Sequence, residues 1–104
     1  MKIENLETFI VDSWLITKIT TDNGLIGVGE STFFGWPRAA EEVVLSFRKY
    51  LIGKDPLNVE HHWNFMYRSK SMRGGSIVGG ISSIDQALWD IKGKYFDTPV
   101  WQLL

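Results

Sequence analysis

The sequence predicts an α+β domain in which a three-stranded antiparallel meander precedes a bundle of helices. Three observations support this prediction. β-branched and apolar residues dominate residues 2–31, an Asp-Asn-Gly turn divides that region, and apolar residues recur at helical spacing across residues 37–96. The chain contains no internal repeat and no linker-like tract, so residues 1–104 are expected to form one domain.

The region of residues 2–31 is expected to contain the three strands. In residues 2–11 the apolar side chains do not keep one parity, so either both faces are partly covered or a bulge shifts the register. Residues 14–21 are rich in β-branched side chains. Asn23-Gly24 then predicts a hairpin, because both residues accept positive φ, and residues 25–30 form the third strand.

The remaining residues are expected to form three helices. The first begins at Pro37, which suits the first helical position, and ends at Gly53. Either Asp55 or Asn58 can cap the second. The third has the clearest apolar stripe, with steps of four and three residues: Ile77, Ile81, Ile84, Leu88, Ile91 and Tyr95. This stripe predicts a helix with one buried face.

Composition and charge exclude several classes of function. The chain has 11 Lys and Arg against 12 Asp and Glu, a net charge of −1, which argues against nucleic acid or an anionic membrane surface as the main partner. No apolar stretch approaches the roughly 20 residues of a membrane span, and the N-terminus lacks the form of a secretion signal. Cysteine is absent, which excludes disulfide and thiolate chemistry. These features predict a cytoplasmic protein.

Two groups of glycines resemble nucleotide-binding loops but favour a packing role. Gly27-Val28-Gly29 lacks the third glycine of a dinucleotide loop, because Thr32 stands there, and glycines within a strand are typical of close backbone approach. The glycines that open the third helix lack the Gly-Lys-Ser/Thr ending of a P-loop: Gly74, Gly75, Gly79 and Gly80. Close packing at the helix start is the favoured interpretation.

The histidines and helical carboxylates also favour structural roles. His61 and His62 point about 100° apart on a helix and cannot share a metal, so both are expected at the surface or half-packed. Asp85 and Asp90 lie within the third helix, where a carboxylate is more often an ion-pair partner than a catalytic acid. Asp90 and Lys94, at i and i+4, predict an exposed ion pair.

Residues 31–36 are the strongest candidate for a binding surface. This segment has no periodicity and places three aromatic residues within four positions, which is typical of a patch that covers a ligand or partner. Residues 12–14, between the first two strands, can lie at the same end of a meander. The candidate site residues are therefore Asp12, Ser13, Trp14, Ser31, Thr32, Phe33, Phe34 and Trp36. The alternative is that the aromatic residues of 31–36 fill the junction between sheet and helix.

Residues 80–104 resemble the signature of the mandelate racemase/muconate lactonizing family of the enolase superfamily. Twelve positions match its pattern of small, acidic, glycine, basic, proline and leucine residues: Ser82, Ser83, Ile84, Asp85, Ala87, Asp90, Gly93, Lys94, Pro99, Val100, Leu103 and Leu104. Gly80 stands where alanine is usual, and the closing glycine would follow Leu104. The Gly-Val-Gly-Glu strand after a hairpin is also typical of the family's N-terminal domain, so the resemblance covers the whole chain.

The resemblance implies an N-terminal capping domain whose C-terminal (β/α) barrel is missing from these residues. Asp12, Ser13 and Trp14 would lie in the first capping loop and residues 31–36 in the second. In the family, a Mg²⁺ ion held by three barrel carboxylates and a Lys or His base carry out the chemistry. The resemblance therefore assigns no catalytic or metal-binding residue to these 104 positions. The piece alone is not expected to be a catalyst, and its apolar end suggests a longer sequence.

The signature is most similar to that of acid-sugar dehydratases, such as galactonate dehydratase. The resemblance implies that the intact protein is a hydro-lyase that abstracts the proton α to a carboxylate and eliminates water. Its expected partners are the acid-sugar substrate, its own barrel domain and, at full length, further copies of itself. A racemase, epimerase or lactonizing member of the same family is the alternative. A free-standing, non-catalytic binding or dimerisation module is the alternative of another class.

Overall fold

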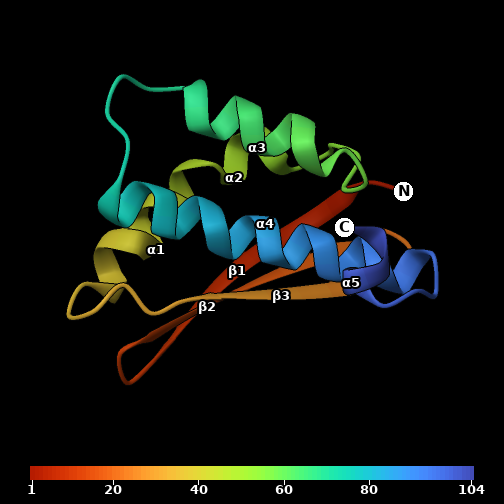
Figure 1. Cartoon of the computed structure of the whole chain (residues 1–104), viewed down its shortest axis with the longest axis horizontal. Coiled ribbons are helices and arrows are strands. Elements are labelled where there is room, and N and C mark those ends of the chain that lie inside the picture. Colours follow the sequence, from red (N-terminus) through yellow and green to blue (C-terminus); the bar gives the residue numbers. More distant parts are fainter.

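Helices cover one face of a three-stranded antiparallel sheet in the computed structural model, which describes residues 1–104 (Figure 1). The strands have the order β1-β2-β3. The elements are β1 (Ile3–Val11), β2 (Trp14–Thr21), β3 (Ile26–Ser31), α1 (Pro37–Ser46), α2 (Arg48–Leu51), α3 (Val59–Arg68), α4 (Gly75–Tyr95) and α5 (Val100–Leu103). The predicted meander followed by helices is confirmed. None of the helices is both long and apolar enough to span a membrane.

A bulge in β1 explains the mixed parity of its apolar residues. The pairing of β1 with β2 shifts register between Ile3 and Asn5. Ile3 and Leu6, three positions apart, therefore both point into the core, while Phe9 lies on the uncovered face of the sheet. Of the two alternatives left open by the sequence, the bulge is the one observed.

The hairpin between β2 and β3 is confirmed, but its geometry differs from the prediction. Only Gly24 has a positive φ, of 86°, and Asn23 does not. The Thr21 hydroxyl donates to the Asn23 side chain, and the Thr21 backbone N–H donates to the Leu25 carbonyl at 2.9 Å. These bonds stabilise a four-residue connection, so β3 begins at Ile26, one residue later than predicted.

The predicted first helix is two helices, α1 and α2, separated at Phe47. The Phe47 N–H donates to the carbonyl of Val44, three residues earlier, which tightens the last turn of α1. The predicted apolar face is nevertheless kept across this break: Ala40, Val44, Phe47 and Leu51 are all buried.

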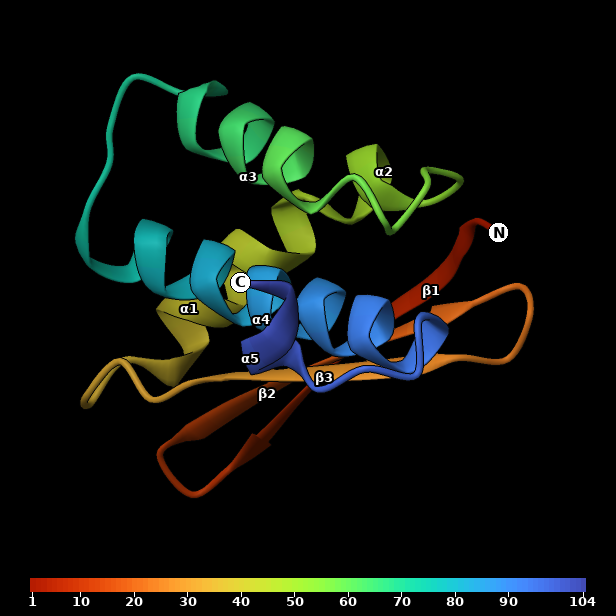
Figure 2. The ribbon, with the colours of Figure 1, turned by 45° about the vertical axis from the view of Figure 1, so that its right-hand side comes forward.

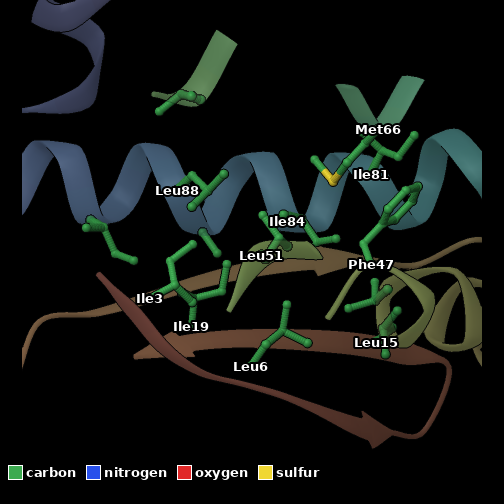
Figure 3. Packing of buried hydrophobic residues seen from close by; sticks show 14 of the residues in the cluster. Ile3, Leu6, Leu15, Ile19, Phe47, Leu51, Met66, Ile81, Ile84 and Leu88 are labelled. Carbon is green, nitrogen blue, oxygen red and sulfur yellow. The ribbon is translucent and has the colours of Figure 1, made fainter. Parts of the chain in front are cut away.

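The core lies between the sheet and α4 (Figure 3). Side chains from β1 and β2 point toward the apolar stripe of α4, and Phe47, Leu51 and Met66 pack at the sides of this core. The sheet contributes Ile3, Leu6, Leu15 and Ile19, and α4 contributes Ile81, Ile84, Leu88 and Ile91. The stripe ends one turn earlier than predicted, because Tyr95 is 49% exposed. At this level α4 has passed the start of β3, where the Lys94 ammonium donates to the Ile26 carbonyl, and no sheet remains to cover Tyr95.

Glycines in β3 allow α4 to lie directly on the sheet. A Cβ atom at Gly27 would lie 2.0 Å from the carbonyl oxygen of Ala87, and one at Gly29 would lie 1.8 Å from that of Ser83. No side chain fits in such a space. Close backbone approach is therefore confirmed as the role of these two glycines.

Candidate functional site

The two segments singled out in the sequence lie at the same end of the sheet. Asp12 and Ser13 form the turn between β1 and β2, while Leu15, the second residue of β2, pairs with Ser31 at the end of β3. This end is opposite the N-terminus (Figure 2). We refer to residues 12–14 and 31–36 together as the loop end.

The hairpin presents its side chains to solvent. Asp12 has a φ of 55°, in the left-handed region that aspartate tolerates in turns. Its carboxylate is exposed and makes no hydrogen bond or ion pair with the protein. Trp14 is exposed on the uncovered face of the sheet, and Ser13 is half-buried. The turn thus carries one free acceptor group beside an aromatic ring.

The three aromatic residues of the second loop divide into two kinds. Phe33 packs against the core, and its ring lies 3.5 Å from the position of a Cβ atom at Gly75, the first residue of α4. Phe34 and Trp36 are 88% and 66% exposed. The junction-filling interpretation therefore describes Phe33, whereas an exposed patch describes Phe34 and Trp36.

The stem of the second loop is held in place and its tip is free. Ser31 is buried, with its Oγ atom 3.0 Å from the Cβ position of Gly79. Thr32 Oγ1 donates to Glu30 Oε1 at 2.5 Å. The Trp36 N–H donates to the Phe33 carbonyl at 2.9 Å, which closes a turn around Gly35 with its φ of 76°. Ser31, Thr32 and Phe33 thus hold the stem of the loop in position, whereas Phe34 and Trp36 are exposed.

A third segment, for which the sequence favoured only a packing role, adjoins the loop end. The connection from α3 ends at Gly74, and α4 begins at Gly75 beside Phe33; the φ values of the two glycines are 96° and 51°. Within it, Arg73 Nε donates to the Tyr67 carbonyl at 2.8 Å, and the guanidinium lies 4.9 Å from the centroid of the Tyr67 ring. The paired glycines were the available signal, but packing was their expected role.

His62 is buried, which corrects the expectation that both histidines lie at the surface or half-packed. It is 1% exposed, and its Nε2 and Nδ1 atoms lie 2.7 Å from the Asp55 carbonyl oxygen and 2.7 Å from the Tyr50 hydroxyl. Because a carbonyl only accepts, Nε2 carries the proton and Nδ1 accepts from Tyr50. Burial lowers the pKa of His62. His61 is exposed, as predicted.

The helical carboxylates lie outside the loop end. Asp90 pairs with Lys94 at 3.3 Å, which confirms the predicted ion pair, and Asp90 Oδ2 also accepts from the Val28 N–H at 3.0 Å. Burial raises the pKa of Asp85, against the opposing effect of a hydrogen bond from the Trp89 side chain. These contacts are structural.

The residues of this chain do not fit a magnesium site. No three His, Cys, Asp or Glu side chains converge in a way that could hold a metal ion. Asp12, the one carboxylate of the loop end, stands alone. What the loop end offers is one acidic group, hydroxyl groups and exposed aromatic rings, a combination suited to contacting a polar ligand from one side.

Comparisons with known proteins point to one family. Residues 5–104 match the family described as mandelate racemase/muconate lactonizing enzyme, N-terminal domain. D-galactonate dehydratase of Cronobacter sakazakii is 46% identical over 106 residues, a match that covers 100% of this chain and 28% of that protein.

Solved structures agree with this match. The 3,6-anhydro-D-galactonate cycloisomerase of Zobellia galactanivorans superposes with a TM-score of 0.91 at 35% identity, covering 99% of this chain and 31% of that one. An enolase of Agrobacterium radiobacter, provisionally designated a galactarate dehydratase and bound to sodium and L-malate, superposes with a TM-score of 0.92 at 29% identity, covering 99% and 27%. The chain thus spans less than a third of the length of these relatives.

Proposed function

Because the chain belongs to the mandelate racemase/muconate lactonizing enzyme family, of which it forms the N-terminal domain, we propose that it caps the substrate of a longer acid-sugar dehydratase. The observation that carries the capping role is the position of both predicted loops at one end of the sheet, with Phe34 and Trp36 exposed there. The 46% identity with D-galactonate dehydratase supports the substrate class.

The reaction proposed for the intact protein is removal of the proton α to a carboxylate, followed by loss of the β-hydroxyl group as water. The expected Mg²⁺ ion stabilises negative charge on such a carboxylate when bound. Since the residues of this chain do not fit that ion, we assign the metal and the base to the part of the protein outside these residues.

The contribution of this chain would be substrate selection and exclusion of water. Asp12 and Ser13 can hydrogen-bond to sugar hydroxyl groups, because the Asp12 carboxylate has no partner within the chain. Phe34 and Trp36 would cover the distal part of the substrate, and a water-poor site strengthens the electrostatic contacts within it. Phe33, which packs against the core, would hold Phe34 and Trp36 in position.

A substrate screen with the intact protein and Mg²⁺ tests the proposal. We expect an aldonate or related acid sugar to lose one molecule of water, detected by mass spectrometry and by trapping of the resulting 2-oxo acid. Trp36→Ala should raise KM, whereas Phe65→Ala, which removes an exposed aromatic ring from α3, should not. A screen that finds only racemisation or epimerisation would exclude the dehydratase.

Cycloisomerisation is the second candidate, because one of the structural relatives is a cycloisomerase at 35% identity. The same screen separates the two, since an isomerase leaves the substrate mass unchanged. If the gene encoded no barrel after Leu104, a non-catalytic binding or dimerisation module would replace both candidates.

A further inference from the structure

α3 lies on the outside of the domain, on the far side of α4 from the sheet (Figure 1). Three of its ten residues are buried, Val59, His62 and Met66, whereas eight of the 21 residues of α4 are buried. A segment with few buried side chains opens at a smaller free-energy cost than the core does. The attachment of α3 therefore depends on a small number of side chains, and one of them is a histidine.

His62 joins α3 to the two segments that precede it in the chain. Its Nδ1 atom accepts from the Tyr50 hydroxyl of α2, and its Nε2 atom donates to the Asp55 carbonyl in the connection from α2 to α3. The Tyr50 ring also stacks on Phe65 of α3, with ring centroids 3.8 Å apart, and meets the His62 ring edge-on at 5.6 Å. The imidazole is thus the polar centre of the contact between α2 and α3.

This hydrogen-bond arrangement is complete only when the imidazole is neutral. A neutral imidazole has one donor and one acceptor, which match the Asp55 carbonyl and the Tyr50 hydroxyl. When Nδ1 takes up a proton it can no longer accept, so the Tyr50 hydroxyl proton loses its acceptor. This hydroxyl makes no other hydrogen bond with the protein. Protonation therefore removes a bond that holds α3 to α2.

The surroundings of His62 also disfavour a positive charge. The side chain is almost fully buried, so an imidazolium there would lose its contact with water. Burial is the main reason why the pKa of His62 is lowered; the nearby positive charges of His61 and Lys54 add to this effect, and Asp55 opposes it. α2 contributes the neutral Tyr50 hydroxyl, and no charged group of α4 or of the sheet shifts this pKa.

We propose that His62 makes the attachment of α3 pH-dependent, so that protonation releases α3 from α2 while α4 stays on the sheet. In the released state water solvates both the imidazolium and the Tyr50 hydroxyl. The core between α4 and the sheet has no group that responds in this way, because the other buried polar side chains are hydroxyl groups: Thr17, Thr21, Ser31 and Ser83. This role of His62 is independent of the proposed enzymatic function.

Release of α3 would reach the loop end through the connection from α3 to α4. Arg73 Nε donates to the Tyr67 carbonyl, and the guanidinium lies over the Tyr67 ring, so the last turn of α3 holds this connection. The connection ends at Gly74, directly before Gly75, on which Phe33 packs. Protonation of His62 would therefore also loosen the support of Phe33 in the second loop.

Hydrogen exchange of the protein at its full length, measured by mass spectrometry of peptides between about pH 8 and pH 5, tests this role. After correction for the intrinsic exchange rate, amides of α3 should lose protection by up to about tenfold for each pH unit below about 6.5, while those of α4 keep theirs. His62→Gln should abolish this difference. His61→Gln is the matched control and should keep most of it, because His61 is exposed.

Tyr50→Phe provides a second variant, which keeps the ring on Phe65 and removes only the hydroxyl. It should lower the protection of α3 more at pH 8 than at pH 5, because the hydroxyl donates only to the neutral imidazole. A purely structural hydroxyl would lower the protection by the same factor at both values. That result, a joint loss of protection in α3 and α4, protection of α3 that does not change with pH, or an unchanged pH dependence in His62→Gln would each overturn the proposal.

Discussion

Gln86 of α4 binds both backbone groups of Glu30 in β3. Its Oε1 accepts from the Glu30 N–H at 3.0 Å, and its Nε2 donates to the Glu30 carbonyl at 3.0 Å. The side-chain amide thus takes the place of a peptide group of a neighbouring strand. Asp90 and Lys94 continue the series at intervals of four residues, about 6 Å along a helix, which matches the two-residue repeat of a strand.

This series explains part of the family signature in physical terms. Asp90 and Lys94 close the edge of β3, and Ser83 and Ala87 lie where the glycines of β3 approach the α4 backbone. Thr17 and Ser83 hydroxyl groups add a buried bond of 2.8 Å between sheet and helix. In this chain these signature positions attach the long helix to the sheet.

Gln86→Ala should destabilise the fold by about 1 kcal/mol, because two hydrogen bonds of a partly exposed edge are lost and water replaces them incompletely. Urea denaturation measures the change. Gln102→Ala is the control, since the Gln102 side chain is exposed and makes no hydrogen bond. Equal stability of Gln86→Ala and the unmodified chain would show that the edge pairing contributes nothing.

Gly29→Ala should be far more damaging, at about 3 kcal/mol or more, because the new methyl group would overlap the Ser83 carbonyl and force α4 away from the sheet. Gly53→Ala separates this steric effect from backbone strain. Gly53 has a φ of 86° with open space around it, so its replacement should cost only about 1 kcal/mol. Similar losses in the two variants, measured by thermal unfolding, would contradict the close packing of α4 on β3.

Phe33→Ala and Phe34→Ala should differ in their effect on stability although the residues are adjacent. The half-buried Phe33 ring packs on the core and on the start of α4, so its removal should cost about 2 kcal/mol. Phe34 is exposed and should change stability by less than about 0.5 kcal/mol. A greater loss from Phe34→Ala would place its ring in a contact that the structure does not show.

Acidification should destabilise the fold through His62. Burial lowers the pKa of His62 in the folded state below the value in the unfolded chain, about 6.5, so the unfolded state binds the proton more readily. The stability is complete above that value and is lost as the pH falls through the folded-state pKa. Burial of Asp85 raises its pKa, so this group acts in the opposite sense.

Denaturant titrations between pH 8 and pH 5 measure this dependence, with both limits chosen to lie about 1.5 pH units either side of the histidine value. His61→Gln should keep most of the slope, because burial is the largest cause of the lowered pKa of His62 and the charge of the exposed His61 is a smaller one. His62→Gln should flatten the slope and lower the stability at neutral pH, since the bonds to Tyr50 and Asp55 are altered. An unchanged slope in His62→Gln would assign the effect to another group.

The sequence by itself determined the meander, the helices, the position of the signature and the two loops. Each of these depends on a local pattern: the β-branched run of 14–21, the glycine at position 24, and the apolar steps from Ile77 to Ile91. Such patterns act through residues close together in the chain, so the structure contains the elements that they predict. The family resemblance rests on the same kind of local spacing.

Only the tertiary structure decided how each of these patterns is used. Phe33 and Phe34 are chemically identical neighbours, and one is a packing residue because α4 begins with glycines beneath it. His62 is buried because Tyr50 and Asp55, from other segments, satisfy both of its ring nitrogens. The start of the β1 edge is likewise paired by distant residues, since Gly53 and Lys54 bond to Ile3, and Arg48 of α2 bonds to Leu6. Burial and pairing are set by residues distant in the chain, and spacing along the sequence does not encode them.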